Sequence, residues 1–78
     1  MFTVEQVSSV ILDDIDGEWI DGYWFEFYKE GGDWYIIVES PDGSKLYDGW
    51  WPNSEDKTLK QAIEEGLKGA ELLKQEQE

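Results

Sequence analysis

The chain contains no cysteine, no histidine and no arginine, and its six basic residues are all lysines. The lack of cysteine excludes a disulfide framework, a thiolate zinc site and a thiol nucleophile. The lack of histidine removes the imidazole base and the usual ligand of transition metals. Without arginine there is no bidentate phosphate clamp, and a formal net charge of −13 repels a nucleic-acid backbone. Direct binding of DNA or RNA is therefore not expected.

Acidic and aromatic residues are abundant together, with nineteen Asp or Glu, five Trp, four Tyr and three Phe among 78 residues. Disordered acidic chains are poor in aromatic and β-branched residues, whereas this chain has apolar runs such as 34–38. We therefore expect one small folded domain. No apolar run reaches the roughly 20 residues of a membrane span, and no basic N-terminal region precedes an apolar stretch. These two absences predict a soluble, cytoplasmic protein.

Periodicity and turn residues predict an α+β fold, in which a three-stranded antiparallel meander is flanked by an N-terminal and a C-terminal helix (order αβββα). Thr3 and Gln6 have the spacing of a capping box at the start of the first helix. Gly22 is read as a kink or bulge within a long first strand. The expected ranges are 3–16 for the first helix, 18–29, 33–39 and 45–51 for the strands, and 55–75 for the second helix, which begins at Glu55 or Thr58. The small residues Gly66, Gly69 and Ala70 predict a close approach of the second helix to the sheet, with the indoles of the sheet as its packing partners.

The excess negative charge lies in the same part of the chain as the aromatic rings. Residues 1–56 hold fourteen acidic residues and two lysines, a net charge of −12, whereas residues 57–78 carry −1. Every aromatic residue lies between Phe2 and Trp51. Exposed aromatic patches tend to be binding surfaces. We therefore expect the binding surface on the end of the first helix and on the sheet, with the second helix as a structural support.

The acidic run 13–18 invites a calcium interpretation, which its spacing does not support. Placing Gly17 at the sixth position of an EF-hand loop puts Leu12 at the first position and Tyr23 at the twelfth, where oxygen ligands are required. A solvated acidic turn explains the run. Paired carboxylates for glycoside hydrolysis would need a cleft, and a three-stranded sheet with two helices has little room for one. We expect no metal, no cofactor and no enzymatic activity, because the usual bases and nucleophiles are missing.

Two aromatic motifs have limited resemblance to known repeats. The segments 32–35, 42–43 and 49–51 together resemble one choline-binding cell-wall repeat over about twenty residues. That family works as tandem secreted repeats, so we interpret these residues as hairpin chemistry. The run 49–52 lacks the tryptophan spacing and the basic sheet of a WW domain, which leaves a Pro-rich ligand groove without support.

The acidic field resembles that of small acidic phage inhibitors, a class that includes DNA mimics and some anti-CRISPR proteins. One acidic anti-CRISPR group, which blocks the PAM-reading site of an RNA-guided nuclease, has the order helix, three antiparallel strands, helix. The resemblance implies a protein whose carboxylates imitate phosphates and occupy a basic groove. It rests on that order and on Asp13, Asp14, Asp16, Glu18, Asp21, Glu26, Glu30, Asp33, Glu39, Asp42 and Asp48.

Our functional prediction is a non-enzymatic protein that binds a basic protein surface and inhibits a nucleic-acid-handling enzyme. A generic acidic interaction domain without mimicry is the first alternative, and an aromatic platform for carbohydrates or small ligands is the second. Charge is expected to come from loops and rings from an exposed sheet face. The predicted partner-binding residues are the acids Asp13, Asp14, Asp16, Glu30, Asp33 and Asp42 and the aromatics Trp24, Tyr28 and Trp51.

Overall fold

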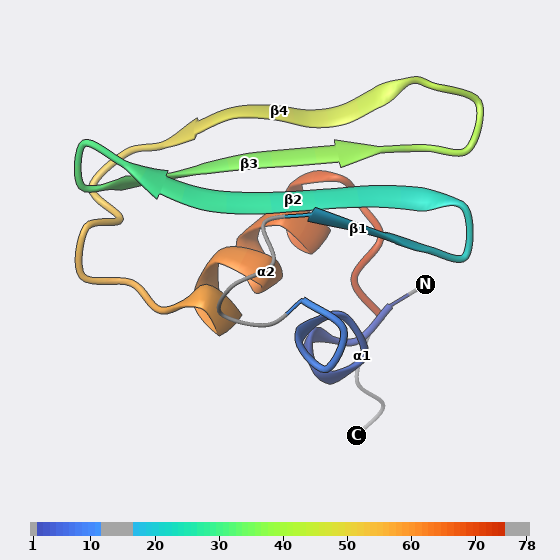
Figure 1. Cartoon of the computed structure of the whole chain (residues 1–78), viewed down its shortest axis with the longest axis horizontal. Helices are drawn as coiled ribbons and strands as arrows, with labels where there is room; N and C mark the ends of the chain where they lie inside the picture. The colour runs from blue at the N-terminus through green and yellow to red at the C-terminus, as the bar shows by residue number, and fades with distance from the viewer. Residues whose placement is uncertain (1, 12–16, 75–78) are drawn as a thin grey trace.

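The computed structural model describes residues 2–11 and 17–74, which form an α+β domain with two helices and four strands in the order αββββα. The strands make one antiparallel sheet in which each strand pairs with the next along the chain, in the order β1-β2-β3-β4 (Figure 1). The elements are α1 (Val4–Ser8), β1 (Gly17–Ile20), β2 (Tyr23–Glu30), β3 (Asp33–Glu39), β4 (Lys45–Trp51) and α2 (Leu59–Gly69).

The prediction of a three-stranded meander was wrong, because the range 18–29 contains two strands and not one. The chain reverses at Asp21 and Gly22, whose φ angles are 52° and 85°. A two-residue turn with positive φ at both positions matches the twist of a tight antiparallel hairpin. It pairs Ile20 with Tyr23 and Trp19 with Trp24. Gly22 is therefore part of a turn, and the strand that follows it runs antiparallel to β1.

The order αββββα also differs from the αβββα order on which part of the resemblance to an anti-CRISPR group rested. The topological part of that likeness is therefore lost. Its other part, the acidic field, does not depend on the number of strands. Strands β3 and β4 have the bounds that the sequence predicts, so the difference in the number of strands arises before residue 31.

Both helices lie on one side of the sheet (Figure 1). α2 packs against β2, β3 and β4, and α1 packs against α2. Alternation along the strands directs Phe25, Phe27, Ile36 and Val38 toward the helices, and each is nearly or completely buried. The core consists of Phe2, Val7, Ile11, Phe25, Phe27, Ile36, Val38, Ala62, Ile63, Leu67 and Ala70. We call this covered side of the sheet the helix face.

Small residues let α2 approach the sheet closely, as its sequence predicts. A β-carbon on Gly66 would lie 2.9 Å from Ile36 Cγ2 and 3.0 Å from Phe27 Cε2. A β-carbon on Gly69 would lie 2.4 Å from two ring carbons of Tyr47. We expected the indoles of the sheet to fill the space beside these small residues. The structure instead places the rings of Phe27 and Tyr47 there.

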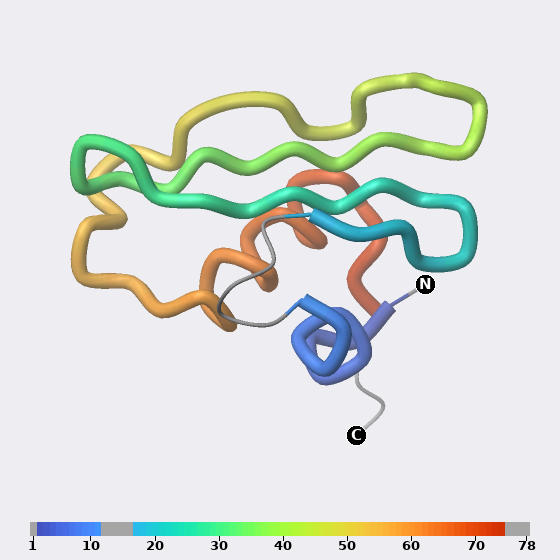
Figure 2. Tube along the Cα trace, viewed as in Figure 1, coloured from blue at the N-terminus to red at the C-terminus, as the bar shows by residue number. Residues whose placement is uncertain are grey.

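Helix α2 ends at Gly69, earlier than the predicted end near residue 75. Glu71 adopts a left-handed conformation with φ 62°. Its N–H donates to the carbonyl of Lys68 (3.1 Å), and the N–H of Leu72 donates to the carbonyl of Leu67 (2.8 Å). These are the two hydrogen bonds of a Schellman motif, which usually has glycine at the left-handed position. The chain then runs beside the N-terminal segment, where Phe2 bridges Leu73 (Figure 2).

Both helices begin with a capping box. Thr3 and Gln6 exchange side chain–backbone hydrogen bonds at 3.0 Å, which confirms the predicted start of α1. α1 ends at Ser8 and residues 9–11 form a turn and a bend, so the predicted helix 3–16 is too long there; its residues 12–16 lie outside the described residues. Thr58 and Gln61 form the second box, so α2 begins after Thr58 and not at Glu55. Within residues 2–11 and 17–74, no helix is both long enough and apolar enough to span a lipid bilayer.

Candidate functional site: the open face of the sheet

The side of the sheet opposite the helices, which we call the open face, carries both aromatic and acidic side chains. Alternation and strand register assign each residue to this face. Trp19 and Trp50 are the most exposed rings, with 60% and 49% of their surface accessible. Five carboxylates and one lysine give the open face a net charge of −4. Its members are Trp19, Trp24, Glu26, Tyr28, Glu30, Asp33, Tyr35, Ile37, Glu39, Lys45, Asp48 and Trp50.

The rings of the open face form two contiguous groups. Tyr28, Tyr35 and Trp50 lie opposite one another on β2, β3 and β4 and make a continuous row. The rings of Tyr28 and Tyr35 stack with centroids 5.5 Å apart, and Trp50 meets Tyr35 edge to face at 4.8 Å. At the other end of the face, Trp19 and Trp24 contact each other at 5.1 Å. The two groups flank a row made of Glu26, Ile37 and Asp48.

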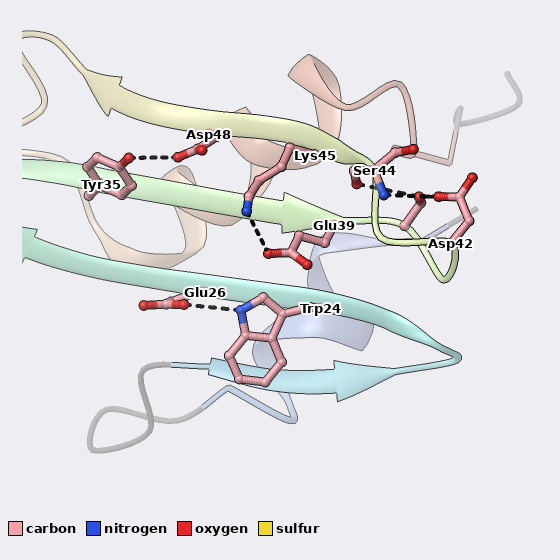
Figure 3. A network of polar contacts seen from close by, with 9 residues as sticks. Trp24, Glu26, Tyr35, Glu39, Asp42, Ser44, Lys45 and Asp48 are labelled. Carbon is pink, nitrogen blue, oxygen red and sulfur yellow. Dashed lines mark hydrogen bonds and ion pairs between the residues drawn. The ribbon is translucent and has the colours of Figure 1, made fainter.

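Two carboxylates of this central row are held by the rings beside them (Figure 3). The indole N–H of Trp24 donates to Glu26 Oε1 at 3.1 Å. The hydroxyl of Tyr35 donates to Asp48 Oδ1 at 2.6 Å, and this bond raises the pKa of Tyr35 above its ordinary value. Each carboxylate is therefore fixed next to an aromatic ring before any partner arrives. Such pre-organisation lowers the entropy that binding must remove.

Trp24 is positioned by the strand next to it as well as by Glu26. A β-carbon on Gly17 would lie 2.5 Å from Trp24 Cζ2, so the indole covers the backbone of β1 at that position. The row across the sheet that begins with Trp19 and Trp24 ends with Glu39 and Lys45, whose side chains form an ion pair at 3.2 Å. Lys45 is the one lysine of the open face, and this pair partly neutralises that corner.

The predicted acidic site residues do not form one cluster. Asp13, Asp14 and Asp16 lie outside the described residues. Glu30 and Asp33 face each other across the turn between β2 and β3, where the Asp33 carboxylate accepts the backbone N–H of Ser54 at 3.2 Å. Asp42 lies at the opposite end of β3, about 20 Å away by the rise of a strand.

Asp42 organises its own turn. Its carboxylate accepts hydrogen bonds from the hydroxyl of Ser40 and from the backbone N–H of Ser44, the latter at 3.0 Å. These bonds, the one from Ser40 first, lower the pKa of Asp42. The geometry explains Asp33 and Asp42 as residues that fix loops, and it leaves Glu30 as an exposed acid at the edge of the open face.

Of the three predicted aromatic contacts, Trp24 and Tyr28 lie on the open face, whereas Trp51 lies on the helix face and packs against the core. The reason is a β-bulge in β3–β4 pairing, where the register shifts between Val38 and Glu39. Regular pairing from Glu39 and Lys45 would set Trp51 opposite Asp33, on the open face. A shift of one residue reverses the direction of every following side chain. It therefore turns Trp50 outward and Trp51 inward.

Sequence reasoning also did not select Trp19, Tyr35 and Trp50, or the carboxylates Glu26 and Asp48, as contact residues. Trp19 joins the open face because the turn at 21–22 sets it opposite Trp24. Tyr35 alternates with buried Ile36, so strand periodicity already separates it from the core. The assignment of Trp50 and Asp48 needs the bulge, for which the sequence contains no separate signal.

Five of the six lysines lie outside the open face. Lys29 points to the helix face, where its ammonium lies 5.6 Å from the centre of the Trp34 ring and donates to the carbonyl of Glu55 at 2.7 Å. Four others follow β4 in the connection to α2, in α2 itself or just after it. The open face accounts for −4 of the formal net charge of −13, so the rest of the chain is negative as well, and the open face differs from it in combining carboxylates with exposed rings. The lysines on the helix side are Lys29, Lys57, Lys60, Lys68 and Lys74.

The concave surfaces outside the open face differ in charge, and one of them is lined by Asn53, Glu55 and Asp56. A groove between the start of α1, α2 and the C-terminal segment is lined by Glu5, Lys60, Glu64 and Lys74 among others. Across the described part of the chain, no group of three or more acidic side chains lies in a geometry that would hold a metal ion. Comparison with protein-family models, with curated proteins and with solved structures finds no match to this chain.

Proposed function

We propose that the protein is a non-enzymatic binding protein whose open face covers a basic, nucleic-acid-binding surface of a partner enzyme and thereby inhibits it. The observation that carries the proposal is the open face itself, which neither α1 nor α2 covers and which combines five aromatic rings with a net charge of −4. Carboxylates attract the partner and set the orientation of approach, and rings supply the apolar contacts that make a complex tight.

The distribution of charge supports a directed encounter. Five carboxylates and one lysine give the open face a negative field that attracts a positive surface. A second copy of the chain is a poor partner for this face, because two faces of the same sign repel each other. Strongly basic grooves are typical of enzymes that handle nucleic acids, so we take such an enzyme, in the cytoplasm, as the partner. The proposal therefore includes a cytoplasmic site of action.

The test is a pull-down at low ionic strength, followed by competition with nucleic acid. We expect DNA or RNA to release the captured partner by competing for the same basic surface. Salt should release it as well, because the Debye screening length shortens from about 10 Å at 0.1 M to about 3 Å at 1 M. A variant with Glu26→Lys and Asp48→Lys should lose the partner. The matched variant Glu64→Lys and Glu71→Lys changes exposed acids of the helix side by the same charge and should retain it.

A partner that binds together with its nucleic acid would contradict inhibition by mimicry and would favour the generic interaction domain. A partner that remains bound equally at low and high salt would contradict the electrostatic account itself.

The row of Tyr28, Tyr35 and Trp50 favours a second candidate, an aromatic platform for a carbohydrate. That function predicts a change in tryptophan fluorescence with oligosaccharides and little dependence on salt. An absence of binding across a glycan array would remove it.

A further inference from the structure

The open face contains two units in which a fixed carboxylate lies beside exposed rings. In the first unit, Glu26 accepts from Trp24, which contacts Trp19. In the second unit, Asp48 accepts from Tyr35, which contacts Trp50. Each unit therefore presents a negative charge and an aromatic surface in the same place.

The two units discriminate between the two kinds of basic side chain, lysine and arginine. A lysine ammonium is compact and strongly hydrated, and it interacts with a carboxylate as a point charge. An arginine guanidinium is planar and more weakly hydrated, so it can stack on a ring while its edge pairs with a carboxylate. The guanidinium therefore uses both parts of such a unit more fully than an ammonium does.

We propose that the open face recognises arginine, in the form of two guanidinium groups of a partner that occupy the two ring–carboxylate units. This inference rests on the proposed function, since it names the chemistry of the surface that the open face covers. Glu26 lies on β2 and Asp48 on β4, in one row across β3. Two strand spacings place the units about 10 Å apart. A lysine-rich surface of equal charge is a weaker partner.

The hydrogen bonds explain why both units are ready to bind. The donated N–H or O–H occupies one oxygen of each carboxylate and fixes its plane beside the ring. The accessible surface of Trp19 and Trp50, 60% and 49%, provides the area on which a guanidinium can stack. Tyr35 is itself oriented by Asp48, so the hydroxyl and the carboxylate support each other.

The test compares oligoarginine with oligolysine peptides of equal length, titrated against the full chain at low ionic strength by calorimetry. Stacking on two rings at exposed sites predicts about a five- to thirtyfold tighter binding of oligoarginine. The variant Trp19→Ala and Trp50→Ala keeps every charge and should bind both peptides with equal affinity. Far-ultraviolet circular dichroism establishes that this variant is folded.

Charge variants separate the two levels of the hypothesis. Glu26→Gln with Asp48→Asn should weaken oligoarginine binding more than Glu64→Gln with Glu71→Gln, which removes two charges from the helix side. Equal binding of the two peptides to the unaltered chain would overturn arginine recognition and leave the basic-partner proposal standing. Failure of both peptides to bind at low salt would overturn the proposed function as well. Self-association that Trp50→Ala abolishes would assign the open face to a second copy and would also overturn the arginine proposal.

Discussion

The close approach of α2 to the sheet predicts that Gly66→Ala destabilises the protein. The added methyl group would lie 2.9 Å from Ile36 Cγ2 and 3.0 Å from Phe27 Cε2, which are tighter than ordinary carbon contacts. Ile36 is 0% exposed and Phe27 3%, so neither side chain can move into solvent. Either the helix or the two side chains must shift within the core.

Two effects of opposite sign set the size of the change. Alanine is a better helix former than glycine by about 1 kcal/mol. Overpacking a well-packed core costs about 1 to 3 kcal/mol. The net result is a loss of about 1 kcal/mol in the free energy of unfolding, which corresponds to a decrease in Tm of about 4 to 8 °C for a domain of this size.

Urea unfolding followed by tryptophan fluorescence measures this loss. Gly49→Ala is the matched control, because a methyl group there meets nothing within 4 Å and its backbone φ is not positive. The control should be neutral or more stable by up to about 1 kcal/mol. Combining Gly66→Ala with Phe27→Leu should cost less than the sum of the two single changes. A gain in stability from Gly66→Ala alone would refute the packing described here.

Three further changes test other parts of the fold. Burial, and then the hydrogen bond to Glu65, raise the pKa of Tyr47 to about 12 from the ordinary 10.0. The neutral phenol's contribution to stability is therefore complete below pH 10 and is lost as the pH rises from 10 to 12. Tyr47→Phe should reduce this alkaline loss of stability, measured as the free energy of unfolding against pH. An unchanged dependence on pH would contradict the prediction. Gly22→Ala should cost about 1 to 2 kcal/mol, because φ is 85° there, and should accelerate hydrogen exchange of the β1 amides; unaltered exchange would argue against the first hairpin. Glu71→Gly should raise the stability by about 1 kcal/mol in thermal unfolding, because glycine relieves a left-handed residue with φ 62°, and a lower Tm would contradict the helix-ending motif.

Local signals in the sequence were sufficient for several elements. The Thr3–Gln6 capping box marks the start of α1, and turn residues around Asp42 mark the bounds of β3 and β4. The small residues of α2 indicated a close approach to the sheet, which Gly66 makes. Each of these signals lies within a few neighbouring residues, so the local sequence is sufficient to predict the feature.

The errors arose where a single residue sets the direction of a whole segment. Asp21–Gly22 is a typical hairpin turn. Interpreting Gly22 as a bulge instead keeps 18–29 as one continuous strand, in which Trp19 points toward the core. The bulge beside Glu39 exchanges the faces of Trp50 and Trp51, and it depends on pairing between strands. Glu71 adopts the left-handed conformation that ends α2, a position where glycine is usual. Because no glycine marks that position, the sequence gives no signal for the end of the helix. The open face emerges only when both strand errors are corrected.

The indole N–H signals of the five tryptophans give the most direct test of the open face as the binding surface. In ¹⁵N-labelled protein, Trp19, Trp24 and Trp50 report on the open face, whereas Trp34 and Trp51 report on the helix face of the same molecule. Titration with oligoarginine at low salt should shift the first three signals, that of Trp24 most directly because it donates to Glu26. The signals of Trp34 and Trp51 should stay in place. Shifts confined to Trp34 and Trp51 would contradict the account.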